Sequence, residues 1–396
     1  MKAKTFGILS AILVVVLAAG ALIVYQKARP KASLKMGTPM IAGISAGDIA
    51  AIHIRNPAES IELVKGSTGW VVQTRYRYPA DFSRIRELVD TVKEAKIGRS
   101  FESTGEIQNR LALLSPIDTT AAEARRGTLI ELKNEKGDSI AEILIGKTRK
   151  RGGKGEVPDG QYVMLDGSQN IFLVDKIFTS FQTGHSSWLA KNPVQINGED
   201  IVKISCEGPD GEGLKYVFER DRKGGEYTLT FPSSGVNVDT ALLNRLSDAL
   251  SSFQIEDVQI RTSGNKGARP SEAGAASKGT GAQLPGKKPG RINFTLFEGL
   301  VYHVYPDPDC SETGPCILRI DVGWEKPGLK KDEKGKEVGA DKTEIPEKEN
   351  QSDAAVRAAQ ENERLSPWVF VVPKWRHDAY ITDLKELIKQ DKEEKT

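Results

Sequence analysis

Histidine and cysteine are scarce in this sequence. Its 396 residues include four His and three Cys, and none of these stands in a His-x-His, Glu-x-x-His or Cys-x-x-Cys spacing. Such spacings place two ligands of one metal ion on the same strand, helical turn or loop. We therefore expect no metal site, and no sequence motif supports a cofactor of another class.

An excess of charge of one sign is also lacking. Lys and Arg number 56 against 54 Asp and Glu, whereas nucleic-acid-binding proteins usually carry a basic face or a strong positive excess. A phosphate loop is missing as well. The stretch "LIGKT" at 144–148 contains a Gly-Lys pair, but Ala141 stands where such a loop requires its first glycine. We expect neither nucleic acid nor nucleotide as a partner.

No arrangement of catalytic residues stands out. His185 adjoins Ser186 and Ser187, but a nucleophile and its base must meet in space, and a third group must orient the base. We expect a protein that is not an enzyme and retain an unrecognised hydrolase as an alternative.

One long apolar run is present. From Phe6 to Tyr25 the chain carries no charged residue, and about 20 residues suffice for a helix to cross the hydrocarbon core of a bilayer. This predicts a single-pass membrane anchor, with residues 1–40 forming the anchor and its juxtamembrane linker. A cleaved signal peptide, with Lys2 and Lys4 before the run and small residues at 18–20, is the alternative.

The orientation of this anchor rests on opposing signals. Four basic residues follow the run and, taken alone, favour a cytoplasmic location, although large domains are translocated largely regardless of such charges. Cys310 and Cys316 flank the turn-rich "SETGP", and a disulfide between them would indicate an oxidising compartment. Two free thiols remain the alternative. The four basic residues are Lys27, Arg29, Lys31 and Lys35.

The chain resembles itself. "ISAGDIAAIHI" at 44–54 is similar to "INGEDIVKISC" at 196–206, and "GWVVQTRYRYPAD" is similar to "EYTLTFPSSGVNVD". The latter two stretches end at Asp81 and Asp239, each directly before an amphipathic helical pattern, so we expect both residues to be helix N-caps. Similarity at a period of roughly 155 residues indicates a duplicated unit.

The predicted fold class is α+β. Alternating hairpin patterns at 127–146 and 290–305 predict mostly antiparallel sheets, with an amphipathic helix in each unit. We expect a first unit at 41–190 and a second at 191–396. Two insertions in the second unit, near 262–290 and 325–365, are rich in small or charged residues and are predicted to be disordered. The second insertion could contain one exposed helix at 353–365.

The Ile-x-Ile strand at 52–54, the strand at Trp70, the Pro-Ala-Asp at 79–81 and the following amphipathic helix resemble the bacterial domain-of-unknown-function family forty-three forty. The resemblance implies an envelope protein whose soluble part lies outside the cytoplasm. It also implies neighbours among ABC-transporter subunits of the gliding-motility auxiliary type. It supplies no catalytic residues, and this chain departs from the family pattern in its insertions and in the basic residues after the anchor.

These observations lead to one expected function. The chain is predicted to be a bacterial inner-membrane protein with its bulk in the periplasm or otherwise outside the cytoplasm. It would contact the bilayer through residues 6–25 and serve as a scaffold or accessory to an ABC-type permease or auxiliary subunit. The alternative is a module that binds a glycan or peptide in a cleft between the units, near His185 and Trp188, because binding sites combine aromatic walls with a few polar groups.

Overall fold

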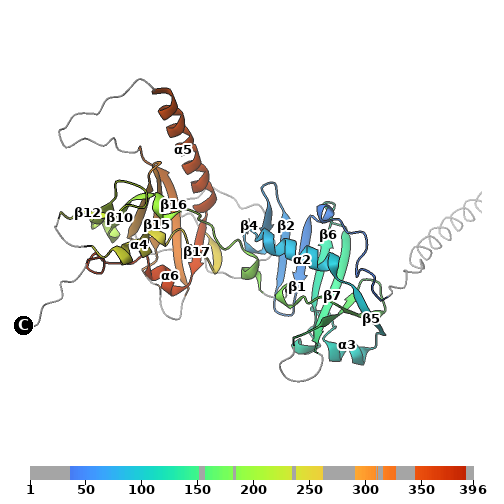
Figure 1. Ribbon diagram of the computed structural model, residues 1–396. Coiled ribbons are helices and arrows are strands. Elements are labelled where there is room, and N and C mark those ends of the chain that lie inside the picture. The colour runs from blue at the N-terminus through green and yellow to red at the C-terminus, as the bar shows by residue number, and fades with distance from the viewer. Residues whose placement is uncertain are drawn as a thin grey trace, which may run out of the picture. The chain divides into compact units, whose positions relative to one another are not determined.

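The computed structural model describes most of the chain after residue 35 (Figure 1). The predicted anchor at 6–25 and nearly all of the insertion at 262–290 lie outside the described residues. Among the residues that are described, no helix is long and apolar enough to cross a bilayer. The described ranges are 36–150, 157–181, 184–233, 238–261, 290–308, 310, 315–326 and 344–388.

The chain forms two compact units. Unit 1 comprises Met1–Glu62 and Ser83–Thr183, and unit 2 comprises Leu63–Phe82 and Gly184–Thr396. The main boundary between the units lies at 183/184, and the boundary predicted from the sequence is at 190/191. The assignment of residues 63–82 to unit 2 was not predicted from the sequence.

The first sheet has nine strands in the order β4-β3-β2-β1-β6-β7-β8-β9-β5 and is antiparallel. Its strands are β1 (Ala51–Arg55), β2 (Ser60–Lys65), β3 (Trp70–Val72), β4 (Tyr78–Pro79), β5 (Ile97–Glu102), β6 (Thr128–Lys133), β7 (Ser139–Arg149), β8 (Gly160–Leu165) and β9 (Asn170–Val174).

Alternating residues build the core of this sheet. Ile52 and Ile54 of β1 are fully buried, and they pair across the ladder with Leu132 and Ile130 of β6. Helix α2 (Phe82–Glu94) crosses one face of the sheet in Figure 1 and buries a stripe at helical spacing. The stripe consists of Ile85, Leu88, Val89 and Val92. Each such side chain contributes about 1.5–3 kcal/mol when removed from water.

The second sheet has eight antiparallel strands in the order β12-β11-β10-β14-β15-β16-β17-β13. Its strands are β10 (Ile201–Glu207), β11 (Leu214–Glu219), β12 (Thr228–Phe231), β13 (Asp257–Ile260), β14 (Arg291–Leu296), β15 (Leu300–Pro306), β16 (Cys316–Trp324) and β17 (Trp368–Val372).

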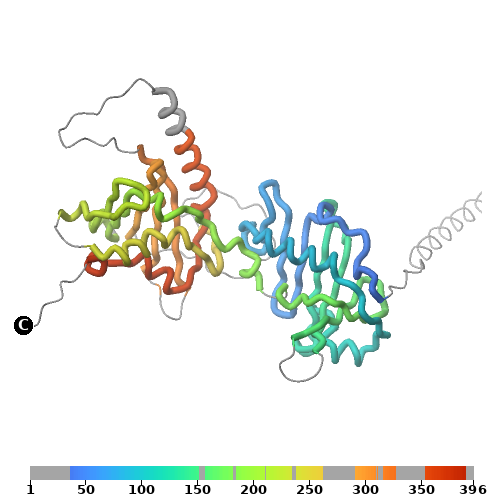
Figure 2. Tube along the Cα trace, viewed as in Figure 1, coloured from blue at the N-terminus to red at the C-terminus, as the bar shows by residue number. Residues whose placement is uncertain are grey.

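The two sheets follow the same plan. Strands β10, β11 and β12 take the places of β1, β2 and β3, while β14 to β17 take those of β6 to β9, and β13 that of β5. Helix α4 (Thr240–Asp248) occupies the chain position of α2 and buries Leu243 and Leu246. The molecule is thus of the α+β class with two antiparallel sheets, which confirms the predicted class. Figure 2 lets the chain be followed through both sheets.

The end of the insertion at 325–365 is helical, as the sequence allowed at 353–365, but this helix packs on the sheet and is not the exposed helix that was expected. Helix α5 (Glu344–Leu365) occupies the end of this insertion and packs on β16. Ala354 and Ala358 are buried at a spacing of one helical turn, and Leu365 is buried at the end of the helix. Small side chains at this spacing let the helix approach the sheet closely. The remaining helices are α3 (Gly105–Leu111) and α6 (Lys374–Asp378).

Candidate functional site

A cavity of about 580 Å³ lies within unit 2. Three segments supply its walls: the chain at 192–200 before β10, the hairpin of β14 and β15, and helix α5. This volume is within the range of ordinary ligand sites. The lining is nevertheless unusually polar for such a site, because most of the side chains carry amide, hydroxyl or charged groups.

Local structure explains why these groups face the cavity. On α5, Arg357, Gln360, Glu361 and Arg364 recur at intervals of three and four residues, which places them on one side of the helix. In the hairpin, Gly299 has a φ of 91° and allows the tight turn that presents Glu298. The cavity is therefore built by two regular elements and one connecting segment.

Ion pairs neutralise the charges along the cavity. Arg357 donates to both carboxylate oxygens of Glu298, at 2.7 and 3.2 Å. Arg364 donates to the carbonyl oxygen of Pro193 at 2.6 Å and also pairs with Glu361. Because both guanidinium groups already have partners, the cavity does not present an open anion-binding site.

Neutral polar groups complete the lining. Burial raises the pKa of Tyr302 to about 12, so its hydroxyl remains protonated and able to donate a hydrogen bond at neutral pH. The amides of Asn192, Gln195 and Gln360 can each donate and accept. This set suits recognition of a polar molecule by hydrogen bonds and does not resemble a set of acid–base catalysts.

The structure brings His185 together with two residues that the sequence did not suggest. His185 Nε2 lies 3.3 Å from Asp257 Oδ2, and Arg75 Nε lies 3.3 Å from Asp257 Oδ1, with all three residues in unit 2. Burial raises the pKa of the Asp257 carboxyl, but hydrogen bonds from His185 and Val258 and the charge of Arg75 outweigh it, so that pKa is below its usual value. The three side chains form a charge-paired cluster.

The other predicted residues of this segment have structural surroundings. Trp188 is fully buried, so its ring offers no face to a ligand. The Ser187 hydroxyl donates to the carbonyl oxygen of Gly184 at 2.7 Å.

The two predicted helix caps differ in what the structure records. The Asp239 carboxylate accepts hydrogen bonds from the backbone N–H groups of Ala241 and Leu242, at 3.0 and 3.2 Å, and so caps α4. Asp81 stands directly before α2, and its own N–H donates to the carbonyl oxygen of Trp188 at 2.8 Å. Neither residue belongs to the cavity.

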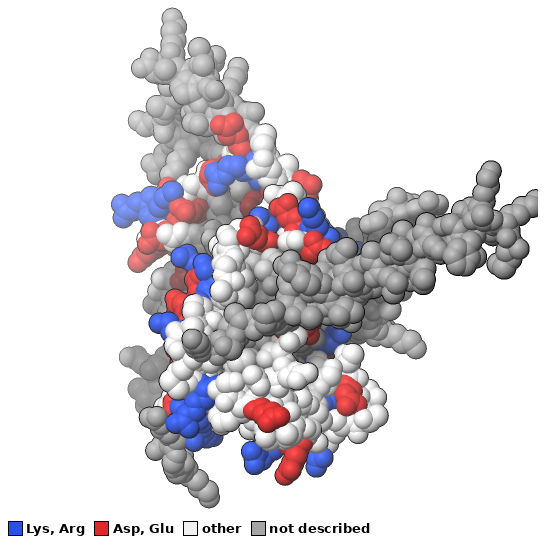
Figure 3. Space-filling model, turned by 90° about the vertical axis from the view of Figure 1, so that its right-hand side faces the viewer, with Lys and Arg blue, Asp and Glu red and all other residues white. Residues whose placement is uncertain are grey.

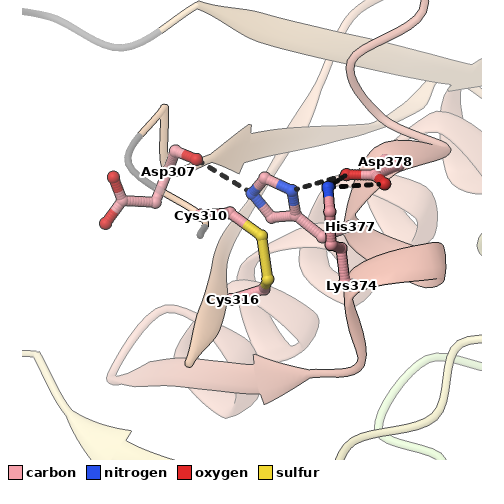
Figure 4. Close-up of a disulfide and its surroundings, with 6 residues drawn as sticks. All are labelled: Asp307, Cys310, Cys316, Lys374, His377 and Asp378. Atoms are coloured by element: carbon pink, nitrogen blue, oxygen red, sulfur yellow. Dashed lines mark hydrogen bonds and ion pairs between the residues drawn. A yellow bond between two sulfur atoms is a disulfide. The ribbon is translucent and has the colours of Figure 1, made fainter. Parts of the chain in front are cut away.

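Cys310 and Cys316 are joined by a disulfide, which Figure 4 shows beside His377. Cys316 opens β16, whereas Cys310 follows the end of β15. Cys206, on β10, is the free cysteine among the described residues, and burial raises the pKa of its thiol.

The sequence of this chain matches the model of a protein family. A family model described as "Domain of unknown function (DUF4340)" matches residues 70–276, slightly more than half of the chain. The chain belongs to the DUF4340 family. This confirms the resemblance drawn from the strand and helix patterns. The match runs from β3 past β13, so α5 and the disulfide of this DUF4340 protein lie beyond the matched residues.

The DUF4340 chain is also similar to a glucose-specific EIICBA component of the PTS system from Mycoplasma genitalium. The two are 28% identical over 151 residues, which is 37% of this chain and 15% of that relative. The chain therefore spans a small part of the length of the curated relative that it matches. No solved structure matches it.

Proposed function

We propose that this DUF4340 protein is a non-enzymatic, single-pass protein of the bacterial inner membrane. Its two sheet units lie outside the cytoplasm and serve as a scaffold or accessory in an ABC-type transport or gliding-related complex. The apolar run at 6–25 supports the anchor. The disulfide between Cys310 and Cys316 carries the assignment of compartment, because disulfides persist where the surroundings are oxidising.

Internal duplication accounts for the two sheets. The same strand order recurs in both, with corresponding helices α2 and α4, and the similarity of residues 44–54 to 196–206 follows the same correspondence. Two copies of one module suit a scaffold, because each copy can present a comparable surface to a different partner.

The location is tested with a C-terminal fusion to alkaline phosphatase, an enzyme that becomes active only outside the cytoplasm. We expect phosphatase activity in the membrane fraction. The matched control lacks residues 1–35 and should be inactive and soluble. An inactive fusion of the full chain, with a cytoplasmic reporter active at the same position, would exclude the proposed orientation.

The partnership is tested separately. The full chain is cross-linked in cells, extracted in detergent and recovered, and the proteins bound to it are identified. We expect an ABC-type permease or auxiliary subunit in stoichiometric amounts. Recovery of the intact chain without any membrane-protein partner would contradict the accessory role.

A second function, binding of a peptide or glycan, is favoured by the cavity of unit 2. Trp324 Nε1 donates to the carbonyl oxygen of Glu298 at 3.3 Å, so its fluorescence should respond when a ligand enters. Envelope peptides and cell-wall glycans are titrated into the full chain and into Gln360→Ala. The control is Arg86→Ala, an exposed position on α2. An unchanged spectrum with all ligands would remove this candidate.

A further inference from the structure

Three residues of the metal-binding type converge at one end of the second sheet. Candidate ligand atoms of Cys310, Cys316 and His377 all lie within 4.8 Å of one another. Cys310 follows β15, Cys316 opens β16, and His377 lies on α6. Figure 4 shows the imidazole ring directly beside the two sulfur atoms. The histidine is far from both cysteines in the sequence, so no local spacing of residues predicts that these three side chains meet.

His377 is a buried histidine whose two ring nitrogens have different surroundings. Its side chain is fully buried. Nε2 lies 2.9 Å from the carbonyl oxygen of Asp307, whereas Nδ1 is buried without a hydrogen-bond partner among the described residues. A buried nitrogen without a hydrogen bond lowers stability, so such a group calls for an explanation.

We propose that, when the disulfide is reduced, Cys310, Cys316 and His377 bind a divalent transition-metal ion of the zinc type. Two thiolates and one imidazole form the ligand set that zinc prefers, and a three-residue set leaves a fourth position open to water or another ligand. The inference goes beyond the proposed function and does not depend on it.

Metal binding requires that the disulfide between Cys310 and Cys316 first be reduced by a dithiol. The reductant supplies two electrons and two protons, the bond between the two Sγ atoms breaks, and the reductant itself becomes a disulfide. Both cysteines are then thiols, and each releases its proton to water as the metal binds. The same residues therefore alternate between a metal-free disulfide and a metal-bound dithiolate.

The geometry requires only a small movement. Two sulfur ligands, each about 2.3 Å from a tetrahedral zinc ion, lie about 3.8 Å apart. Cys316 is fixed in β16, where it pairs with Val372 of β17. Cys310 lies outside the strands and is less buried. The separation of the sulfurs is therefore assigned to Cys310.

The neighbours of His377 orient its ring for this role. Metal-binding histidines normally donate their second ring N–H to a carbonyl or carboxylate oxygen. Here Nε2 faces the carbonyl of Asp307, and Nδ1 lies 3.7 Å from the Asp378 carboxylate. Lys374 holds that carboxylate at 2.9 and 3.1 Å (Figure 4). Whichever nitrogen binds the metal, the other retains an oxygen neighbour.

The test uses the full chain in detergent, reduced with a dithiol that is then removed under anaerobic conditions. Co²⁺ is the probe because it reports its ligands by colour. We expect one equivalent to bind, with a thiolate-to-cobalt charge-transfer band and the visible bands of a tetrahedral site, and Zn²⁺ to displace it. The oxidised protein should show none of these bands. A reduced, folded protein that stays colourless would overturn the proposal.

Variants decide which residues bind the ion. His377→Gln should weaken Co²⁺ binding by about tenfold or more, and Cys310→Ser should remove the charge-transfer intensity of one thiolate. Cys206→Ser, the matched control, should leave the spectrum unchanged. An unaltered affinity in folded His377→Gln would overturn the site, as would loss of the bands in Cys206→Ser. Should circular dichroism show that His377→Gln does not fold, Cys310→Ser decides in the same way.

Discussion

Helix α5 should detach from the second sheet when a charge is placed beneath it. The substitution is Ala358→Glu, at a residue with 2% of its surface exposed, on the side of α5 that packs on β16. A carboxylate there would be buried without a partner. We expect the C-terminal part of α5 to separate from the sheet, which would remove the side of the cavity that the helix forms.

The structure sets the magnitude. Burial of Leu365 contributes about 1.5–3 kcal/mol and each buried alanine methyl about 0.8 kcal/mol. Asn362 Oδ1 accepts a hydrogen bond from the N–H of Val322 on β16 at 2.9 Å, which adds about 1 kcal/mol. The exposed pair of Arg357 and Glu298 adds about 0–1 kcal/mol. These contributions sum to about 4–7 kcal/mol, which is comparable to the cost of an unpaired buried charge, about 3–5 kcal/mol.

Hydrogen–deuterium exchange of the backbone amides in α5 measures this attachment. Ala358→Glu should lower their protection by several orders of magnitude while the amides of β14 and β15 stay protected. The control is Val356→Glu, which adds the same charge to the same helix at a residue with 53% of its surface exposed, and which should change stability by less than about 0.5 kcal/mol. Unchanged protection of α5 in Ala358→Glu would refute the reasoning.

Three further predictions concern stability, each measured by urea denaturation. Asp239→Ala should cost about 1 kcal/mol through loss of the α4 cap; an unchanged midpoint would contradict the capping role. The Asp257 carboxyl has a folded pKa below its usual 3.8, so its contribution to the free energy of unfolding is complete above pH 3.8 and is lost as the pH falls through the folded pKa. Asp257→Asn should therefore show a weaker loss of stability in acid. A stability–pH profile identical to that of the unsubstituted protein would contradict this prediction. Reducing the disulfide without metal should cost about 2 kcal/mol by loop entropy, a loss that Cys310→Ser reproduces and that reduction of that variant should not increase.

Much of the fold could be predicted because it depends on local patterns. Ile52 and Ile54 alternate as a half-buried strand requires, and the stripe of α2 recurs at helical spacing. The capping role of Asp239 could be predicted because the residue stands directly before an apolar helical stripe. Each of these signals lies within a few residues of the chain, where sequence and structure are directly coupled.

Strand β16 was not predicted, and the helix that the sequence allowed at 353–365 was expected to be exposed, whereas α5 packs on β16. In the order of the two sheets, β16 takes the place of β8, and β17 takes the place of β9. The insertion between β16 and β17 hid this correspondence. The high charge density of the insertion favoured disorder. The buried alanines of α5 each remove little area from water, so their apolar signal in the sequence is weak, and yet they pack the helix on the sheet.

The sites escaped for a different reason. Arg75, His185 and Asp257 are far apart in the sequence and meet only through the fold. The same holds for His377 and the two cysteines. A spacing rule can find ligands on one turn of helix or one loop, but it cannot find a group whose members are brought together by several strands.

The outermost strands on one side of the two sheets share a further feature. Strand β4 contains Pro79, and β12 is followed at once by Pro232. Proline has no N–H with which to extend a ladder. Beside β4, the carbonyl oxygen of Pro79 already accepts a hydrogen bond from the N–H of Ala190 at 2.9 Å. Beside β12, a strand from a neighbouring copy would find no N–H at Pro232. Crowded copies of the protein should for that reason resist stacking into fibrils along these borders.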